Sequence, residues 1–129
     1  MRLLLDTHAV VWYTYADPKL SPAARTAIRD ATNEVWLSPA SYWELAIKMH
    51  LGKWQLKHPY PVFIDTVLNG YGFRVLPILP EHTARLVGLP NHHRDPFDRL
   101  LIAQAIVEGM SVVSADATFD SYGVSRLWA

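Results

Sequence analysis

Short apolar runs alternate along this chain with longer segments that begin with strong helix-start signals. Each apolar run is only a few residues long and is bounded by polar or turn-forming residues, which is typical of a buried β-strand. The predicted strands are residues 2–5, 35–37, 73–78, 111–114 and 124–128. Because helical segments separate these strands, the pattern favours an α/β fold with a mainly parallel sheet and right-handed crossovers.

Three predicted helices share one start signal, a capping side chain followed by proline at the first helical position. The signals are Ser21-Pro22, Ser38-Pro39 and Asp95-Pro96. They predict helices that run to about residues 31, 51 and 108, and glycine at 52 and 109 stops the last two. The spacing of apolar residues predicts three more helices at 8–16, 61–68 and 80–87.

The chain has 129 residues, half of them apolar, which is enough for one sizeable core and too few for two. We therefore expect a single domain over residues 1–129. No stretch approaches the roughly 18 apolar residues of a membrane helix, so we expect neither an anchor nor a signal peptide. The sequence contains no cysteine, which excludes disulfides and thiolate metal sites and suits the cytoplasm.

The formal net charge is zero, so composition supplies no long-range attraction to phosphate of the kind that a strongly basic nucleic-acid binder has. A local basic strip can still contact phosphates while acids elsewhere cancel the sum. The candidate strip is Lys48, Lys53 and Lys57, with His50 and His58 nearby. A solvated helix end and loop would carry the same charges, and the sequence leaves both interpretations open.

Four acidic side chains are predicted to meet at one edge of the sheet. In a parallel α/β fold the carboxyl ends of the strands form the ligand edge, and each crossover helix starts there. Asp6 directly follows the first strand, and Glu44 lies in the second turn of the helix after the second strand. Asp98 lies in the first turn of the helix predicted to start at residue 96, and Asp116 closely follows the 111–114 strand. We therefore expect four carboxylates at one rim.

Crowded carboxylates repel one another and raise their own pKa values, so such a cluster is unfavourable unless a cation neutralises it. Mg²⁺ or Mn²⁺ suits this donor set, since hard divalent ions prefer oxygen ligands in octahedral geometry and keep several waters. One of those waters can serve as a nucleophile, which points to phosphate-ester hydrolysis rather than acyl transfer.

Each acid also has a purely structural interpretation, and for most of them it is local: a helix cap, a turn cap or an ion pair one helical turn away. The groups concerned are Asp95 with Asp98, Asp116 with Asp120, and Glu44 with Lys48 as a surface pair. Asp6 is harder to explain in this way, because a charge that ends a buried strand needs a partner. The joint placement of the four acids at one rim favours the functional interpretation.

Thr7 and Ser114 carry hydroxyls beside two of these acids and can orient the carboxylates through hydrogen bonds, although turn formers would look the same. The histidines show no metal-ligand spacing, and His92-His93 is interpreted as part of a surface loop. Most aromatic residues fall at core spacing and are interpreted as core rather than as base-stacking platforms. Among them are Trp12, Trp36, Trp43 and Trp128.

Four blocks that span nearly the whole chain carry a further pattern in their order and spacing. The blocks are Leu3-Leu4-Leu5-Asp6-Thr7-His8, Ser38-Pro39-Ala40-Ser41-Tyr42-Trp43-Glu44-Leu45, Asp95-Pro96-Phe97-Asp98-Arg99-Leu100-Leu101-Ile102-Ala103-Gln104-Ala105, and Ser114-Ala115-Asp116 with Phe119 and Tyr122. Together they resemble the PIN-domain family, and specifically the VapC-type toxins of bacterial and archaeal toxin–antitoxin pairs.

The resemblance implies a single PIN-like domain, with a parallel five-stranded sheet flanked by helices, that forms a homodimer and cleaves RNA with Mg²⁺ or Mn²⁺. The family's acids fall on Asp6, Glu44, Asp98 and Asp116, and Ser114 stands where threonine is common. Asp98 precedes the family's Leu-Ile-Ala-x-Ala sequence, which leaves Asp95 as a cap or auxiliary residue. The resemblance also implies products with a 5′-phosphate and a 3′-hydroxyl, and a small antitoxin whose tail occupies a groove by the active site.

Our hypothesis from the sequence is a metal-dependent endoribonuclease, the toxin of a type II pair. Asp6, Asp98 and Asp116 would hold the metal, and Glu44 would bind it or orient the attacking water. A non-toxin PIN nuclease for RNA processing and a non-catalytic RNA-binding module stay open as alternatives. A haloacid-dehalogenase-like phosphatase is disfavoured, because its second Asp two residues after the first is replaced here by His8.

Overall fold

Strand β1 (Arg2–Leu5) lies at the centre of a five-stranded sheet in the computed structural model, which describes residues 1–129. The strand order is β3-β2-β1-β4-β5, and every neighbouring pair is parallel. The other strands are β2 (Glu34–Leu37), β3 (Arg74–Val75), β4 (Ser111–Val113) and β5 (Arg126–Leu127). The predicted parallel α/β architecture is confirmed.

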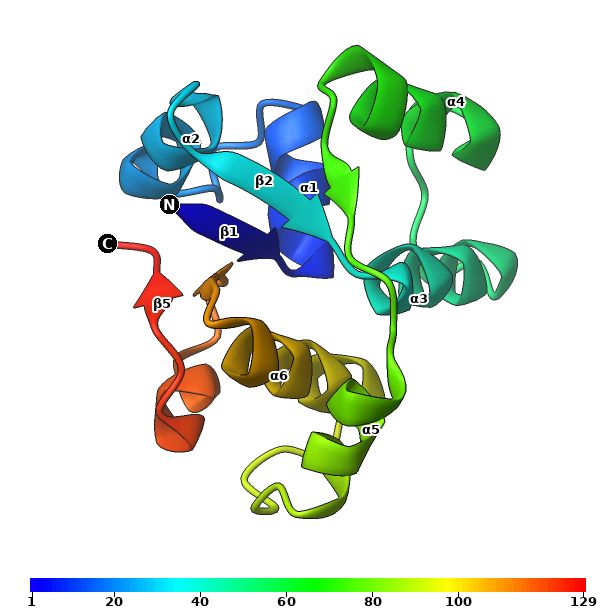
Figure 1. Cartoon of the computed structure of the whole chain (residues 1–129). Helices are drawn as coiled ribbons and strands as arrows, with labels where there is room; N and C mark the ends of the chain where they lie inside the picture. The colour runs from blue at the N-terminus through cyan, green and yellow to red at the C-terminus, as the bar shows by residue number, and fades with distance from the viewer.

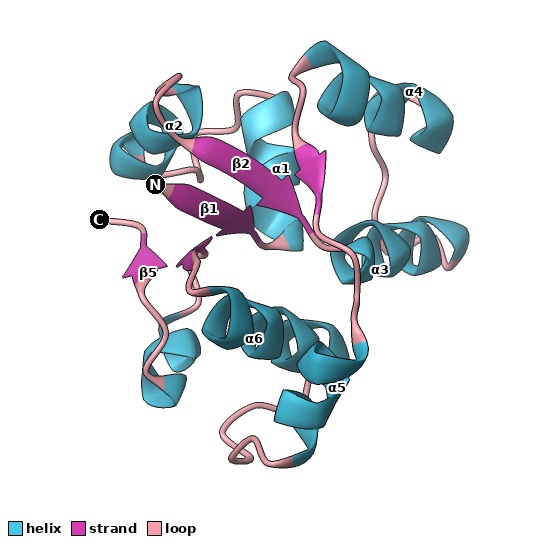
Figure 2. Cartoon of the chain, viewed as in Figure 1, coloured by secondary structure: helices cyan, strands magenta, loops and turns pink.

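Helices connect the strands and lie on both faces of the sheet (Figures 1 and 2). They are α1 (Thr7–Thr14), α2 (Pro22–Arg29), α3 (Pro39–His50), α4 (Tyr60–Asp65), α5 (Pro80–Val87) and α6 (Pro96–Glu108). The three predicted start signals act as caps. The side chains of Ser21, Ser38 and Asp95 accept hydrogen bonds from backbone amides in the first turns of α2, α3 and α6.

The edge strands are shorter than the apolar runs that predict them, and two segments have helical forms that the sequence does not predict. After β3 the Leu76 amide still donates to the Leu37 carbonyl, but Pro77 has no amide to continue the ladder. Helix α4 continues into a wide π-helical turn, η1 (Thr66–Gly70). A 3₁₀ helix, η2 (Ala117–Tyr122), follows β4 where the sequence indicates only turns.

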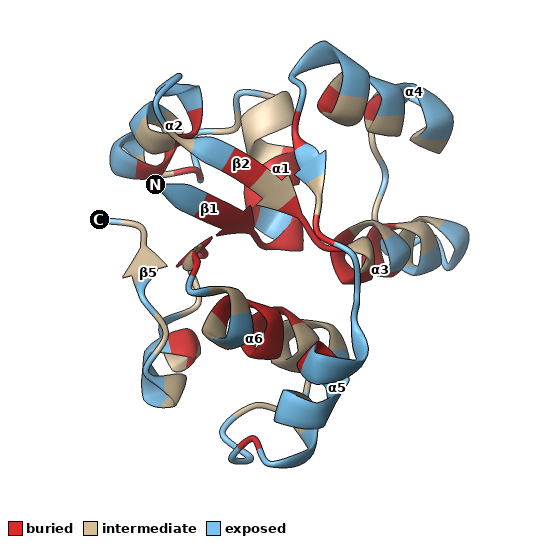
Figure 3. Cartoon of the chain, in the orientation of Figure 1, coloured by how far each residue is buried: buried red, intermediate tan, exposed pale blue.

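The central strand supplies the core on both faces, because successive side chains of a strand point in opposite directions. Leu3 and Leu5 pack with residues of α1, α2 and α4, whereas Leu4 packs with residues of α6. All three leucines are completely buried. Figure 3 shows buried residues along β1 and β2 and at the start of α3. This packing fixes the sheet edge at which α1 and α3 begin.

None of the helices combines the length and the apolar character needed to cross a membrane.

Candidate active site

The structure brings the four predicted acids to one pocket of about 300 Å³ at the carboxyl ends of β1, β2 and β4. Residues from α1, α3, α6 and the segment after β4 form its walls. They are Asp6, Thr7, His8, Trp12, Glu44, Lys48, Asp95, Asp98, Ala115 and Asp116. Five of these ten residues are acidic, so the pocket concentrates negative charge although the chain as a whole is neutral.

Asp6 lies where β1 passes into α1 and is only 8% exposed. Its Oδ1 accepts the Ala9 amide at 2.8 Å, so it caps α1 while it lines the pocket. Burial raises the pKa of Asp6, although hydrogen bonds from Ser114 and from the Ala9 amide oppose that shift. One oxygen therefore serves the helix, and the carboxylate as a whole lacks a cationic side-chain partner.

Glu44 is buried, with 5% of its surface exposed, and two side chains bind its carboxylate. The Thr7 hydroxyl donates to Oε1 at 2.5 Å, and the Lys48 ammonium donates to Oε2 at 2.9 Å. The predicted pair with Lys48 therefore exists, but the interpretation of a surface pair is wrong because Glu44 lies inside the pocket. Thr7 orients Glu44 from across the pocket instead of its neighbour Asp6.

Asp95 and Asp98 divide the two functions that the sequence leaves open for them. Asp95 Oδ1 accepts the amides of Phe97 at 2.9 Å and Asp98 at 3.3 Å, which makes Asp95 the cap of α6. Asp98 does not cap a helix, and its side chain lines the pocket. Desolvation, followed by repulsion from Asp95, raises the pKa of Asp98 to about 7, and Asp6 and Glu44 add to the repulsion.

Asp116 is the most exposed of the four acids, with 41% of its side chain accessible. Its Oδ1 accepts the Thr118 amide at 2.9 Å, and its own amide donates to Ser114 Oγ at 3.0 Å. Desolvation would raise the pKa of Asp116, but hydrogen bonds from His93 and Thr118 outweigh it and hold the pKa below its ordinary value. Asp116 therefore stays ionised beside the partly neutral Asp98.

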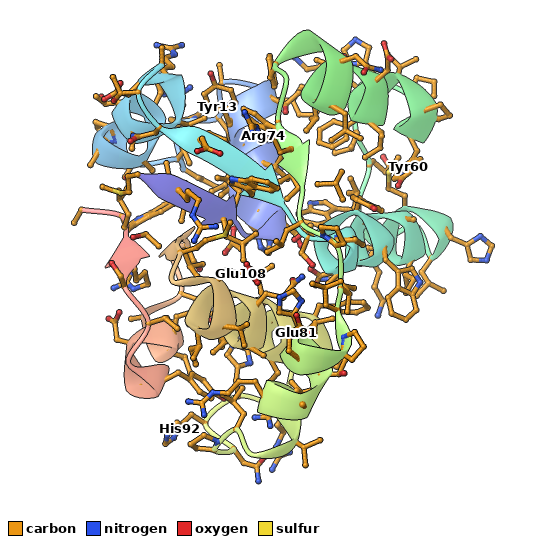
Figure 4. All side chains as sticks on the ribbon, in the orientation of Figure 1. Tyr13, Tyr60, Arg74, Glu81, His92 and Glu108 are labelled. Atoms are coloured by element: carbon orange, nitrogen blue, oxygen red, sulfur yellow. The ribbon has the colours of Figure 1, made fainter.

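His93 joins the site, which corrects the interpretation of His92-His93 as surface loop. Its Nε2 lies 2.9 Å from Asp116 Oδ2 and 3.2 Å from Asp98 Oδ2. The Asp95 amide donates to Nδ1 at 3.3 Å, so in the neutral ring Nε2 carries the proton and faces both carboxylates. His92 is exposed on the loop between α5 and α6 (Figure 4). Its ring lies edge-on to Tyr122.

No spacing rule in the sequence predicts the position of His93, because the loop before α6 folds back over the end of β4. The nearest metal-ligating atoms of His93, Asp98 and Asp116 all lie within 4.8 Å of one another. His93, which lies shortly before Asp95 and Asp98 in the sequence, can therefore offer a nitrogen ligand to a metal ion. The RDPFD turn that follows His93 is the feature that aims it inward, since Asp95 both caps α6 and binds the ring.

The interpretation of the tryptophans as core is correct in part. Trp36 and Trp128 are half-buried and pack against the two core clusters. Trp43 is 60% exposed, with its ring edge-on to Phe97 at 5.3 Å, so the core interpretation is wrong there. Trp12 packs against the core on one side and lines the acidic pocket on the other.

The donor set suits a divalent cation. Several carboxylate oxygens from separate elements face one small pocket. Desolvation first, and repulsion from the neighbouring acids second, raise the pKa of Asp98 and make its ionisation unfavourable. A divalent cation removes that repulsion, and oxygen ligands with one imidazole nearby match hard or borderline metals. The arrangement resembles the sites that hydrolyse phosphate esters more than a nucleophile and base pair for acyl transfer.

The PIN domain family model matches residues 3–124 of the chain. Ribonuclease VapC22 of Mycobacterium tuberculosis (strain ATCC 25618 / H37Rv) is 32% identical to the chain over 121 residues, which cover 93% of this chain and 91% of that protein.

Two solved structures have a similar fold. The structure of VapBC2 from Rickettsia felis, bound to a DNA fragment from their promoter, superposes with a TM-score of 0.71 at 16% identity and covers 98% of this chain and 99% of that chain. VapBC-1 from nontypeable Haemophilus influenzae superposes with a TM-score of 0.65 at 17% identity and covers 98% of this chain and 96% of that chain. At these identities the likeness concerns the fold.

Proposed function

Because the chain belongs to the PIN domain family, we propose that it is a metal-dependent endoribonuclease that hydrolyses RNA phosphodiesters in the acidic pocket. The observation that carries this proposal is the meeting of Asp6, Glu44, Asp98 and Asp116 in one small pocket from four separate elements. Helix capping accounts for Asp6 and Asp116 only in part, and it accounts for neither Glu44 nor Asp98. A cation site accounts for all four.

We assign the four acids separate tasks in that site. Asp6, Asp98 and Asp116 hold Mg²⁺ or Mn²⁺, and Glu44 binds the ion or orients the attacking water. When bound, such an ion supplies a polarised water and a counter-charge for the phosphate. Thr7 keeps the Glu44 carboxylate in one orientation, and His93 keeps Asp98 and Asp116 together while the ion is absent. Ser114 and Asp95 support the site through backbone hydrogen bonds.

The biological setting that we propose is a type II toxin–antitoxin pair. The relative described above is named Ribonuclease VapC22, and the two structures of similar fold described above are of VapBC2 and VapBC-1. We therefore infer a homodimer, with RNA as its substrate and a small antitoxin as its protein partner. Co-purification with the product of an adjacent reading frame, followed by recovery of nuclease activity when that product is removed, tests this setting.

The proposed activity is tested by incubating the purified chain with RNA in Mg²⁺ or Mn²⁺, with EDTA as the control. We expect internal cleavage that requires the ion and leaves a 5′-phosphate and a 3′-hydroxyl. RNA binding without cleavage under every metal condition would favour the alternative of a non-catalytic RNA-binding module. Cleavage with no toxicity and no neighbouring partner would favour the RNA-processing alternative.

We expect Thr7→Val to weaken Mn²⁺ binding by about 10- to 100-fold, the range typical of residues that orient metal ligands. The substitution preserves the shape of the side chain and removes the only hydroxyl that donates to Glu44 Oε1. Isothermal calorimetry measures the affinity. Thr14→Val is the matched control, since the Thr14 hydroxyl donates within α1 to the Val10 carbonyl. Equal affinities in the two variants would contradict the orienting role of Thr7.

A further inference from the structure

A row of aromatic rings adjoins the acidic pocket on the side of α1. The His8 ring contacts two tryptophans at tilted angles, with its centroid 5.2 Å from Trp12 at 50° and 4.8 Å from Trp54 at 57°. Trp12 in turn lies 6.0 Å from Trp128. The rings come from α1, from the loop after α3 and from the carboxyl end of the chain. His8 and Trp12 also line the pocket, so the row is continuous with the site of the proposed chemistry.

Core packing explains only part of this row. Trp12, Trp54 and Trp128 are half-buried and pack against the core cluster beneath them. His8 is exposed, although its two neighbours in α1, Thr7 and Ala9, are buried. An exposed imidazole that is tilted against two indole rings adds little to the core. The tryptophans therefore give His8 a rigid support, and His8 presents an aromatic surface at the mouth of the pocket.

Two lysines lie along the same row. Lys48 Nζ is 5.3 Å from the centroid of Trp54, and Lys19 Nζ is 6.0 Å from the centroid of Trp12. Lys48 also reaches into the pocket to Glu44, and 35% of its side chain is exposed. Positive charge therefore lies on the rim of a pocket that is otherwise acidic. Alternation of aromatic surfaces with cations is the combination by which proteins bind single-stranded nucleic acid.

We propose that His8, supported by Trp12 and Trp54, is a stacking platform for an unpaired RNA base next to the bond that is cut, with Lys48 and Lys19 facing the neighbouring phosphates. This inference rests on the proposed function and adds to it a base-binding position at the His8 ring. In an A-form duplex the faces of the bases are covered by their neighbours, so only an unpaired base can offer one to the His8 ring. Trp12 would then have two roles, in the core and as a support for His8.

The first test measures binding without cleavage, in protein that also carries Asp98→Asn. Quenching of tryptophan fluorescence by a short single-stranded oligoribonucleotide reports the affinity and the contact with the platform together. We expect His8→Ala to weaken binding about tenfold, in the range of one lost base stack, and His8→Phe to retain most of the affinity. His92→Ala removes an exposed imidazole that also touches an aromatic ring, and it should leave the affinity unchanged.

The second test identifies what the platform binds. An oligoribonucleotide with an abasic site opposite the platform keeps its phosphates, so His8→Ala should make no difference to its affinity, and a fully paired duplex should bind weakly to both proteins. If His8→Ala and the parent bind every RNA equally, or if the loss is the same for abasic RNA, the platform is refuted. Because binding is measured directly, in protein whose cleavage the Asp98→Asn substitution reduces, this failure is distinct from a failure of the proposed nuclease activity.

In the otherwise unaltered protein, we expect His8→Ala to raise KM for single-stranded RNA more than it lowers kcat. A platform that only positions substrate acts on binding, whereas a residue that acts on the reacting phosphate would lower kcat. Melting temperatures of the His8 variants show whether they are folded, and His8→Phe keeps the test valid if His8→Ala is not. A fall in kcat with unchanged KM would overturn the assignment of His8 to binding.

Discussion

Asp98→Asn is expected to reduce RNA cleavage by on the order of 10³-fold and, at the same time, to raise the melting temperature of the metal-free protein at pH 7.5. The loss of activity follows from the loss of a charged ligand. The gain in stability follows from the unfavourable position of that ligand when no cation is bound, since desolvation and neighbouring acids raise the pKa of Asp98 to about 7.

The sign of the stability effect follows from proton linkage. The pKa of Asp98 is raised from 3.8 in an unfolded chain to about 7 in the folded one. The folded protein therefore holds the proton more tightly than the unfolded chain does. The contribution of this proton to the free energy of unfolding is fully present below pH 4 and is lost as the pH rises through 7. At about 1.4 kcal/mol per pKa unit, the loss is at most on the order of 4 kcal/mol. The neutral amide of Asn at position 98 does not ionise, so the variant does not lose this stability.

Two smaller effects oppose the gain without reversing it. A negative charge in the first turn of α6 stabilises the helix by about 0.3–1 kcal/mol, and the substitution removes that contribution. The close approach of His93 Nε2 to this side chain, at 3.2 Å, is compatible with the substitution, because an amide oxygen can accept from Nε2. We therefore expect a net gain of roughly 1–3 kcal/mol at pH 7.5, which a domain of this size shows as several degrees in Tm.

Asp120→Asn is the matched control for Asp98→Asn. Asp120 is also an acid near the carboxyl ends of the strands, but it is exposed and the hydrogen bonds from Arg126 lower its pKa. Removing its charge should leave cleavage unchanged and should not stabilise the protein. Thermal unfolding in EDTA and cleavage in Mn²⁺ measure both properties. A metal-free protein that is destabilised by Asp98→Asn would contradict the picture of repelling carboxylates.

The opposing effects on activity and stability explain why this pocket has to be held by strong local structure. Asp6, Asp95 and Asp116 each cap a helical segment, so backbone amides offset part of the repulsion among the acids. The structural interpretation of these residues is therefore correct, and it is compatible with the functional role that we propose for them. A cap fixes the position of a carboxylate, and a second oxygen of the same carboxylate is left for the pocket.

Most of the fold could be predicted from the sequence because its signals are local. Ser21-Pro22, Ser38-Pro39 and Asp95-Pro96 start helices through contacts within three residues, and Leu3 to Leu5 alternate between the two faces of a strand. The resemblance to the PIN family is confirmed as well. The lengths of β3 and β5 could not be predicted, since an edge strand ends where its one partner ends.

The geometry of the site depends on contacts between distant residues, and this is where sequence reasoning failed. His93 contacts Asp116 across 23 positions of the chain, and the loop that places it has no regular period. Thr7 contacts Glu44 across 37 positions, so the sequence could indicate a hydroxyl near the acids but not which carboxylate it binds. The contact of His8 with Trp54 likewise depends on how the loop after α3 folds back. Topology places strand ends together, but side-chain partners are decided by packing.

We expect Mn²⁺ at a hundredfold excess over its Kd to raise Tm by roughly 10 °C at pH 7.5, and by much less at pH 5.5. An ion that binds only the folded protein stabilises it by about 2.7 kcal/mol at that excess. The shift depends on pH because a proton on Asp98, with its pKa of about 7, has to leave before the carboxylate can bind the ion. Below pH 7 each unit should weaken apparent affinity by up to about tenfold, because the bound ion competes with one proton.

Asp98→Asn is also the decisive control for this pH dependence. Without the titrating carboxylate, the remaining acids should bind Mn²⁺ more weakly, and the shift in Tm should vary much less between pH 5.5 and 7.5. Differential scanning calorimetry at several Mn²⁺ concentrations separates affinity from the stability of the metal-free protein. A metal shift that is equally large at both pH values in the unaltered protein would show that Asp98 is not a ligand, since binding would then release no proton from it. The four acids would in that case share a pocket without sharing an ion.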